Sequence, residues 1–371
     1  MGNSSPDGDT RGPRNVAGLR WTDPRTPFTW RGWSFGADLL RFGGNESPYP
    51  PPQELLDAIA AGADRINRYP FGMETSLVEA LSERLGCSAE QVMIAPGTSA
   101  LVEAVIKGLG GPDHEVVYPD SSYPAYRGAA SAVRAQTRAV PLRPDGTCDI
   151  EGIADACSAR TSLVIVCNPN NPTGGMAPTA DLRPLVDALP AGTLLMIDEA
   201  YWEFTDEYAR GGNGALDYLE CGKPVLVTRT FSKFYGMAGL RVGYGVASRE
   251  VAGELHARLR LGGSNIVGLV AAEKALGLTD VFAERAERVK AERGRLTEAF
   301  CDLGFDPLPT QTNFIFCRHT DDDLPAKLMA AGYWVRDGRS VQMPSGMRVT
   351  VGSPDENDKL LAAIRAIAEP G

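Results

Sequence analysis

Between residues 92 and 231, the chain contains five short apolar runs that alternate with amphipathic segments. The runs are rich in β-branched residues and cover residues 92–95, 115–119, 162–168, 193–200 and 224–231. Because successive positions are apolar, the side chains must be buried on both faces of a sheet, which is typical of parallel strands covered by helices. Segments such as 53–66 and 75–86 have the helical period that such a cover needs. The sequence therefore predicts an α/β fold with a mostly parallel central sheet.

The pattern changes after about residue 280. A long charged helix is predicted over 281–304, followed by strands over 313–318 and 347–352 and a last helix over 355–368. These elements indicate a smaller α+β domain. Residues 1–35 show no helical or strand period and hold Pro, Gly and Trp at irregular spacing. We therefore expect a flexible N-terminal arm (1–35), a small domain (36–67 with 266–371) and a large ligand-binding domain (68–265).

Composition excludes several classes of partner. The formal net charge of -10 provides no cluster of Lys and Arg for nucleic acid or an anionic membrane surface. No apolar run approaches the roughly 18–20 residues that cross a bilayer, and the first residues are polar. The 7 cysteines are scattered with no C-x-x-C pair, and the 3 histidines lie far apart, so we expect no disulfide framework and no metal site. A cytoplasmic protein that acts on small molecules is the expectation.

Polar side chains follow three of the apolar runs, where an open α/β sheet binds its ligand. The third run leads into N-P-N-N-P-T-G (168–174), the fourth into D-E-A-Y (198–201), and the fifth into T-F-S-K (230–233), with Arg241 eight residues later. Each segment alone has a structural explanation: a turn, a helix cap, or a surface Ser-Lys pair. Their occurrence together and in this order favours a functional site.

Further motifs belong to the same set: N-E-S-P-Y (45–49), R-Y-P (68–70), P-G-T-S (96–99), P-D-S-S-Y-P-A-Y (119–126), G-L-R-V-G (239–243), Asn313-Phe314 and M-R-V-T-V-G (347–352). With them, from about Asn45 to Arg348, the chain resembles the fold-type I pyridoxal 5'-phosphate (PLP) dependent aminotransferases of class I and II. The histidinol-phosphate aminotransferase group is the most similar. This resemblance implies a large domain with a mostly parallel sheet that carries PLP, and a smaller α+β domain.

The resemblance also implies a role for each matching residue. Lys233 would carry PLP as a Schiff base and move the proton during catalysis. Asp198 would pair with the protonated ring nitrogen. Asn171 and Tyr201 would donate to the ring oxygen, and Tyr123 would stack on the ring.

The phosphate of PLP would be bound at the start of the helix that follows Gly97. The residues implied in this cup are Thr98, Ser99, Thr230, Ser232 and Arg241, together with Tyr69 from the neighbouring subunit of a homodimer. For Thr98 and Ser99, helix capping remains an alternative that uses the same groups.

Three residues match substrate-side positions of the family. Arg348 would bind the substrate carboxylate, because a planar guanidinium suits bidentate recognition of an anion. An exposed Arg on an edge strand is the alternative. Asn45 and Arg336 complete the set, and Arg336 is the candidate for a second anionic group.

Two segments depart from the histidinol-phosphate aminotransferase pattern. The N-terminal stretch T-P-F-T-W-R-G-W-S-F-G-A-D-L-L-R-F (26–42) lacks the usual Pro-Tyr element, and L-G-G-S-N (261–265) lacks an aromatic wall, which predicts a roomier pocket. A specialised amino acid or amino-phosphate substrate is therefore as consistent as histidinol phosphate. Trp21, Trp30 and Trp33 either line that pocket or pack the arm.

The leading hypothesis is transfer of an amino group from a donor, glutamate, to an oxo acid or oxo-phosphate. The alternative keeps the cofactor but breaks another bond, as in a decarboxylase resembling threonine-phosphate decarboxylase or another Cα-carbanion lyase or cyclase. A non-catalytic PLP-binding module is disfavoured, because no basic DNA-binding segment precedes residue 45. A nicotinamide dehydrogenase is disfavoured because no G-x-G-x-x-G follows the first strands.

Overall fold

In the computed structural model, which describes residues 39–259, 261 and 263–368, the five apolar runs pair within one seven-stranded sheet. Its order is β2-β8-β7-β6-β5-β3-β4. Strands β4, β3, β5, β6 and β7 run parallel to one another, and only β8 is antiparallel to its neighbours β7 and β2. The predicted α/β fold with a mostly parallel sheet is therefore confirmed. The strands are β2 Val92–Ala95, β3 Glu115–Pro119, β4 Gln136–Val140, β5 Thr161–Cys167, β6 Leu194–Asp198, β7 Val225–Thr230 and β8 Gly243–Ala247.

Two strands of this sheet, β4 and β8, have no apolar run. Strand β4 lies at the edge, and four of its five residues are exposed, so its polar side chains need no burial. Strand β8 lies inside the sheet but contains Gly243 and Gly245. A Cβ atom on Gly243 would clash with the backbone nitrogen of Thr98. The helix that begins at Thr98 can therefore approach this strand closely only because residue 243 is glycine.

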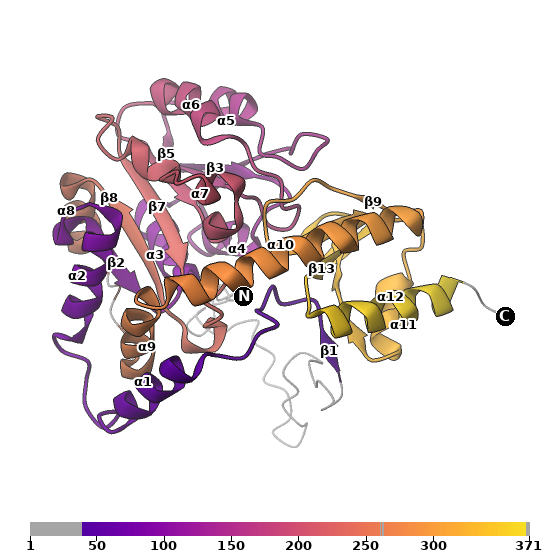
Figure 1. Cartoon of the computed structure of the whole chain (residues 1–371). Coiled ribbons are helices and arrows are strands. Elements are labelled where there is room, and N and C mark those ends of the chain that lie inside the picture. Colours follow the sequence, from indigo (N-terminus) through magenta and orange to yellow (C-terminus); the bar gives the residue numbers. More distant parts are fainter. Residues whose placement is uncertain (1–38, 260, 262, 369–371) are drawn as a thin grey trace, which may run out of the picture. The chain divides into compact units, whose positions relative to one another are not determined.

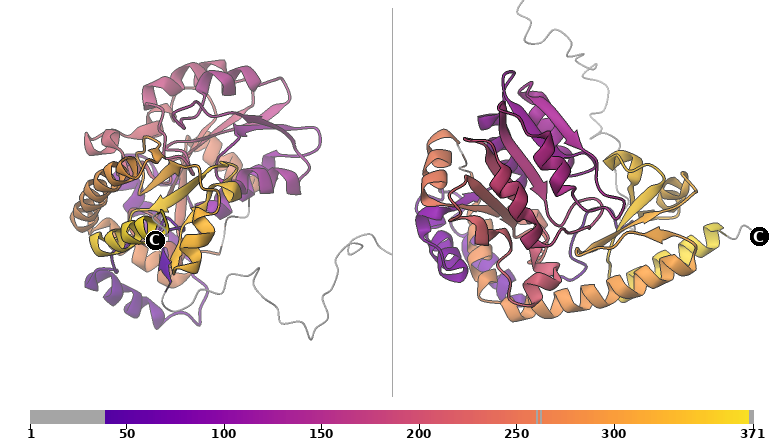
Figure 2. Two further views of the ribbon diagram at one scale, coloured as in Figure 1. Left: turned by 90° about the vertical axis from the view of Figure 1, so that its right-hand side faces the viewer. Right: turned by 90° about the horizontal axis from the view of Figure 1, so that it is seen from above.

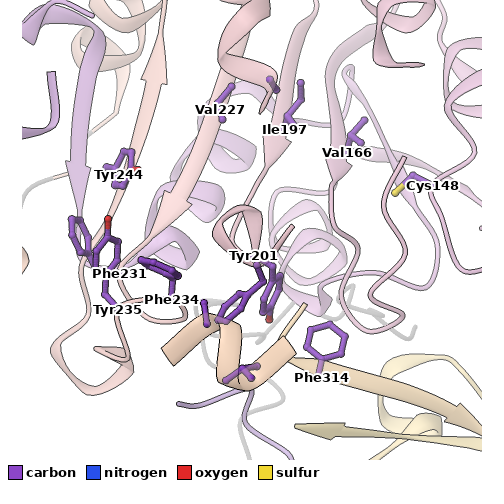
Figure 3. Packing of buried hydrophobic residues seen from close by; sticks show 14 of the residues in the cluster. Cys148, Val166, Ile197, Tyr201, Val227, Phe231, Phe234, Tyr235, Tyr244 and Phe314 are labelled. Atoms are coloured by element: carbon purple, nitrogen blue, oxygen red, sulfur yellow. The ribbon is translucent and has the colours of Figure 1, made fainter. Parts of the chain in front are cut away.

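Helices cover both faces of the sheet, and alternate residues of each strand enter different apolar clusters. Val166 of β5, Ile197 of β6 and Val227 of β7 point to one face (Figure 3). Ile165 and Met196 belong to the opposite face. The helices are α1 Gln53–Ala63, α2 Met73–Leu85, α3 Thr98–Leu109, α4 Pro124–Ala132, α5 Ile150–Ala156, α6 Arg183–Ala188, α7 Asp206–Ala209, α8 Arg249–Arg258, α9 Ile266–Leu276, α10 Thr279–Asp302, α11 Leu324–Ala330 and α12 Pro354–Ala368.

The C-terminal elements build a second, antiparallel sheet of order β12-β13-β10-β9 (Figure 1). The long helix α10 contacts the segment directly after β6 and, further along, β9 and β10, so it links the two sheets (Figure 2). A short parallel pair, β1 with β11, adds the first described strand to the C-terminal part. The bounds are β1 Leu40–Arg41, β9 Asp306–Pro307, β10 Phe314–Arg318, β11 Tyr333–Trp334, β12 Arg336–Asp337 and β13 Gly346–Thr350.

The expected domain boundaries stay predictions. From Leu40 onward the chain forms one compact unit, which contains both sheets. The expected N-terminal arm (1–35), with Trp21, Trp30 and Trp33, lies outside the described residues.

Candidate active site

A cavity of about 560 Å³ lies at the carboxyl ends of β5, β6 and β7. Its wall is completed by the start of α3 on one side and by β12 and β13 on the other. Every residue to which the resemblance gave a role in binding or catalysis lines this cavity except Tyr69: Asn45, Thr98, Ser99, Tyr123, Asn171, Asp198, Tyr201, Thr230, Ser232, Lys233, Arg241, Arg336 and Arg348. The strand order thus brings together side chains that are far apart in the chain.

Lys233 follows the end of β7 and places its amine in the cavity. Its Nζ donates to the carbonyl oxygens of Asn45 (3.0 Å) and Gly44 (3.3 Å). Burial lowers the pKa of the amine to about 7, and the Arg348 and Arg241 guanidinium groups act in the same direction, while Glu46 opposes them. A large share of the amine is therefore neutral near pH 7.

Asp198 is the last residue of β6 and is only 4% exposed. Its Oδ2 accepts a hydrogen bond from the Tyr126 hydroxyl (2.7 Å) and its Oδ1 accepts one from the Thr228 hydroxyl (3.2 Å). Burial raises the pKa of this carboxyl despite both bonds. A cationic ligand bound in the cavity would stabilise a carboxylate in such a place.

Tyr126 and Thr228 are hydrogen-bond partners of Asp198 to which the sequence assigned no role. A signal was present for each. Tyr126 lies three residues after Tyr123 on the first turn of α4, where residues i and i+3 share a face. Thr228 lies two residues before Thr230 in β7 and therefore points to the same face of the sheet.

Tyr201 and Asn171 are held by residues of the C-terminal part and of the segment after β1. Asn45 Nδ2 donates to the Tyr201 hydroxyl (2.8 Å), and Arg348 donates to Asn171 Oδ1 and to the Gly43 carbonyl oxygen (2.7 Å). Burial raises the pKa of Tyr201, so its hydroxyl keeps its proton and remains a donor. The Nε of Arg348 is buried and finds no hydrogen-bond partner among the described residues.

The start of α3 forms one end of the cavity. The N-cap residue of this helix is Gly97, which has no side chain to cap it, and the Thr98 hydroxyl donates to the Arg229 carbonyl oxygen (3.1 Å). The Ser99 hydroxyl lies 2.8 Å from the Tyr123 hydroxyl. Gly97 has φ +83°, and a Cβ atom there would lie 2.6 Å from Arg241 Nη2. The Arg241 guanidinium thus lies directly against the start of α3. The positive charge of Arg241 and the backbone N–H groups of the first turn both favour binding of an anion here.

Arg336 and Arg348 lie opposite each other on the neighbouring strands β12 and β13. Burial lowers the pKa of both, and for Arg348, where the pKa falls to about 10, the charge of Arg336 adds to the effect. Two partly desolvated cations in one wall favour an anionic ligand.

Tyr69 lies on the loop between α1 and α2, outside the cavity of its own chain, with its side chain 81% exposed. Of residues 261–265, those that the structure describes do not line the cavity, so their effect on its size stays a prediction. Glu46, Cys167, Ser340 and Val341 do line it, without having been assigned from the sequence.

Within the described ranges, no helix has the length and apolar character to cross a bilayer, and no group of three or more His, Cys, Asp or Glu could hold a metal ion. All seven cysteines lie in these ranges and are unpaired.

Comparisons with known proteins agree with this geometry. The family model of the class I and II aminotransferases matches residues 37–364. A histidinol-phosphate aminotransferase of Cupriavidus pinatubonensis is 34% identical over 89% of this chain and 89% of its own length. An aromatic amino acid aminotransferase of Streptomyces coelicolor is 35% identical over 88% of this chain and 90% of its own.

Among solved structures, the histidinol-phosphate aminotransferase of Sinorhizobium meliloti in complex with pyridoxal 5'-phosphate superposes with a TM-score of 0.82. It is 27% identical and the match covers 94% of this chain and 99% of that one. The predicted family and fold type are thereby confirmed. The chain belongs to the class I and II aminotransferases, the PLP-dependent family that its sequence resembles.

Proposed function

We propose that this aminotransferase moves an amino group from glutamate to an oxo acid or oxo-phosphate acceptor, and that Lys233 is the residue that binds PLP covalently. One observation carries the proposal: the Lys233 amine, the Asp198 carboxylate and the Arg348 guanidinium line a single cavity. A nucleophilic amine, a counter-ion and an anion receptor are the three groups that this reaction needs.

The residues of the cavity fit the cofactor. The uncapped start of α3 with Arg241 suits a phosphate group, and Thr98, Ser99, Thr230 and Ser232 would add hydroxyl donors. Buried Asp198, whose pKa is raised in the absence of a cation, suits a protonated ring nitrogen. When bound, the cofactor supplies a ring that accepts the electron pair released at the substrate α-carbon.

Each side chain around that ring would have its own role. Neutral Lys233 would hold the cofactor and would take the proton from the substrate α-carbon, which a pKa near 7 allows. Asp198 would keep the ring nitrogen protonated, Asn171 and Tyr201 would donate to the ring oxygen, and Tyr123 would lie against the ring.

The paired arginines support substrates with two anionic groups. Arg348 would bind the α-carboxylate, with Asn45 beside it, and Arg336 would bind the second group. Glutamate carries two carboxylates, and an oxo-phosphate acceptor carries a phosphate. The relatives act on histidinol phosphate or aromatic amino acids by name, at 34% and 35% identity, so both acceptor types are to be tested.

A homodimer in the cytoplasm completes the proposal. The exposed ring of Tyr69 lies 5.6 Å from that of Phe71, itself 87% exposed, and Ile66, three residues before Tyr69 in the chain, is 68% exposed. Such a cluster of large apolar side chains is typical of an interface. From there Tyr69 would reach the phosphate in the partner's cavity.

The decisive experiment is a half-reaction. Holoenzyme mixed with glutamate and no acceptor should release about one equivalent of 2-oxoglutarate per subunit and then stop, as a ping-pong mechanism requires. Borohydride reduction of the resting holoenzyme should fix PLP on the peptide that contains Lys233, and Lys233→Ala should abolish both results while the protein stays folded.

Release of carbon dioxide without an oxo acid would instead support the decarboxylase alternative. Reductive trapping of PLP on another lysine would refute the role of Lys233. A screen of donors and acceptors by the same stoichiometric assay then identifies the substrates.

A further inference from the structure

A buried ion pair lies directly behind the cofactor-facing ends of β6 and β7. Glu199 Oε2 accepts hydrogen bonds from both Nε (2.9 Å) and Nη2 (2.7 Å) of Arg229, and the two side chains are only 2% and 6% exposed. Asp198 and Thr230 are the chain neighbours of this pair and line the cavity, whereas Glu199 and Arg229 do not. Alternation along the strands explains why neighbouring residues serve opposite faces.

The pair also anchors the surrounding segments. Glu199 Oε1 accepts from the Ala215 backbone N–H (2.7 Å), and Arg229 Nη2 donates to the Asn213 carbonyl oxygen (2.6 Å). On its backbone, Arg229 accepts the hydrogen bond from the Thr98 hydroxyl at the start of α3. Three segments that contribute to the cavity therefore meet at Arg229, which belongs to β7, binds the residue after β6 through its guanidinium and binds the start of α3 through its backbone carbonyl.

We propose that Glu199 and Arg229 are positioning residues, which hold Asp198, Thr230 and Thr98 at the mutual spacing that one PLP molecule requires. This inference rests on the proposed function. A buried ion pair contributes little net stability, because desolvation of the two charges offsets their attraction. Two N–H groups of one planar guanidinium that donate to the same carboxylate oxygen, however, restrict the geometry of the pair. Neutralising one partner leaves the other charge buried and unpaired, so we expect a lower thermal midpoint in addition to weaker cofactor binding.

Glu203 provides a matched control within the same cluster. It is a second buried carboxylate, 5% exposed, and its Oε2 finds no partner among the described residues. Burial raises its pKa to about 7, and Arg229 opposes that rise. Glu203 lies in the turn Trp202–Phe204 rather than beside a cavity residue, so it does not tie the strand ends together.

The test compares Glu199→Gln with Glu203→Gln. The Glu199→Gln side chain has the same shape as the native one, but its single oxygen could accept from Arg229 or from the Ala215 N–H, not from both. For each apoprotein, the dissociation constant of PLP is measured by absorbance titration and the thermal midpoint by circular dichroism. We expect Glu199→Gln to weaken PLP binding by roughly tenfold or more, as outer partners of binding residues do elsewhere, and to shift the pH titration of the bound cofactor's absorbance. Glu203→Gln should match the wild type in its PLP dissociation constant and in the pH titration of the bound cofactor's absorbance.

Arg229→Lys keeps the charge but replaces the planar guanidinium, whose Nε and Nη2 both donate to Glu199, by a single amine. It should weaken PLP binding as Glu199→Gln does. Wild-type affinity and spectrum in Glu199→Gln would overturn the inference. The inference would also fail if Glu199→Gln and Glu203→Gln lost PLP affinity to the same extent and in proportion to the fall in their thermal midpoints. If the wild-type protein itself failed to bind PLP, the proposed function would fail instead, so the two failures are distinguishable.

Discussion

At the scale of single residues, the cavity sets the protonation state of its groups. Lys233 is an ordinary amine whose pKa falls from 10.5 to about 7 because of burial and the nearby arginines. Asp198 is an ordinary carboxyl whose pKa rises because of burial. The shift of Lys233 places its amine in the range where enzymes use a base, since a base works best with a pKa near the working pH.

The first prediction concerns pH. Below a pKa of about 7 the Lys233 amine is protonated and cannot attack, and above it the amine is neutral. The rate at which apoprotein attaches PLP should therefore rise with pH, reach half its maximum near pH 7 and then level off. Stopped-flow absorbance measures this rate. A rate that still climbs near pH 10, about the pKa of a free lysine, would contradict the shift.

The second prediction concerns Asp198→Asn. The variant keeps the shape of the side chain but loses the charge that holds the ring nitrogen protonated, and one of the Tyr126 and Thr228 hydroxyls must turn to accept from the new amide group. Turnover should fall by about a hundredfold or more, while PLP stays bound. The free energy of unfolding of the apoprotein should not decrease, because burial already disfavours the charged carboxylate. Activity assays and denaturant unfolding measure the two effects, and near-normal turnover would rule out the role.

At the scale of elements, the start of α3 and the ends of the parallel strands build the anion-binding end of the cavity. The helix can approach β8 because Gly243 leaves room for the Thr98 backbone. Its uncapped first turn and the adjacent Arg241 have the same preference for negative charge. The close approach of the α3 backbone to β8 therefore places the helix start beside Arg241 at the anion-binding end of the cavity.

The third prediction concerns Gly97→Ala. A methyl group there faces a φ of +83° and a guanidinium nitrogen 2.6 Å away, so Arg241 must move. Such strain costs about 1–3 kcal/mol, which corresponds to roughly a ten- to hundredfold weaker binding of PLP by titration. Gly128→Ala in α4 is the control, since nothing lies within 4 Å of its Cβ. The control should bind PLP normally and gain about 0.5–1 kcal/mol of stability; equal affinity in both variants would contradict the argument.

At the scale of the whole molecule, the two sheets enclose the cavity between them, and each supplies a different function. The seven-stranded sheet presents Lys233 and Asp198, and the four-stranded sheet presents Arg336 and Arg348. One exposed residue, Tyr69, has no place in the cavity of its own chain. The proposed dimer accounts for it.

The fourth prediction is subunit complementation. If Tyr69 serves the partner's cavity, Tyr69→Ala and Lys233→Ala should each impair the homodimer. A mixed dimer of the two variants then contains one intact site. Unfolding and refolding the mixture should restore roughly a quarter of the wild-type activity, because half of the random dimers are mixed. No recovery, despite mixed dimers seen by native mass spectrometry, would show that Tyr69 does not act across the interface.

Much of the fold could be predicted because buried parallel strands leave continuous apolar runs. Strands β4 and β8 could not, since an exposed edge strand needs no apolar side chains and β8 gives up side-chain volume to admit α3. For the cavity, motif chemistry identified the groups at the strand ends. It did not identify Tyr126 or Thr228, whose hydrogen bonds to Asp198 depend on helix position and strand register.

Burial pattern and motif composition are local properties, so they can be recognised in the amino-acid sequence, and they specify the buried strands, the family and the chemical groups available to PLP. The lowered pKa of Lys233, the pairing of Arg336 with Arg348 and the ion pair of Glu199 with Arg229 become visible only in the folded chain. These properties arise from desolvation and from register between distant strands. Desolvation of these groups and the register of distant strands arise only when the chain folds.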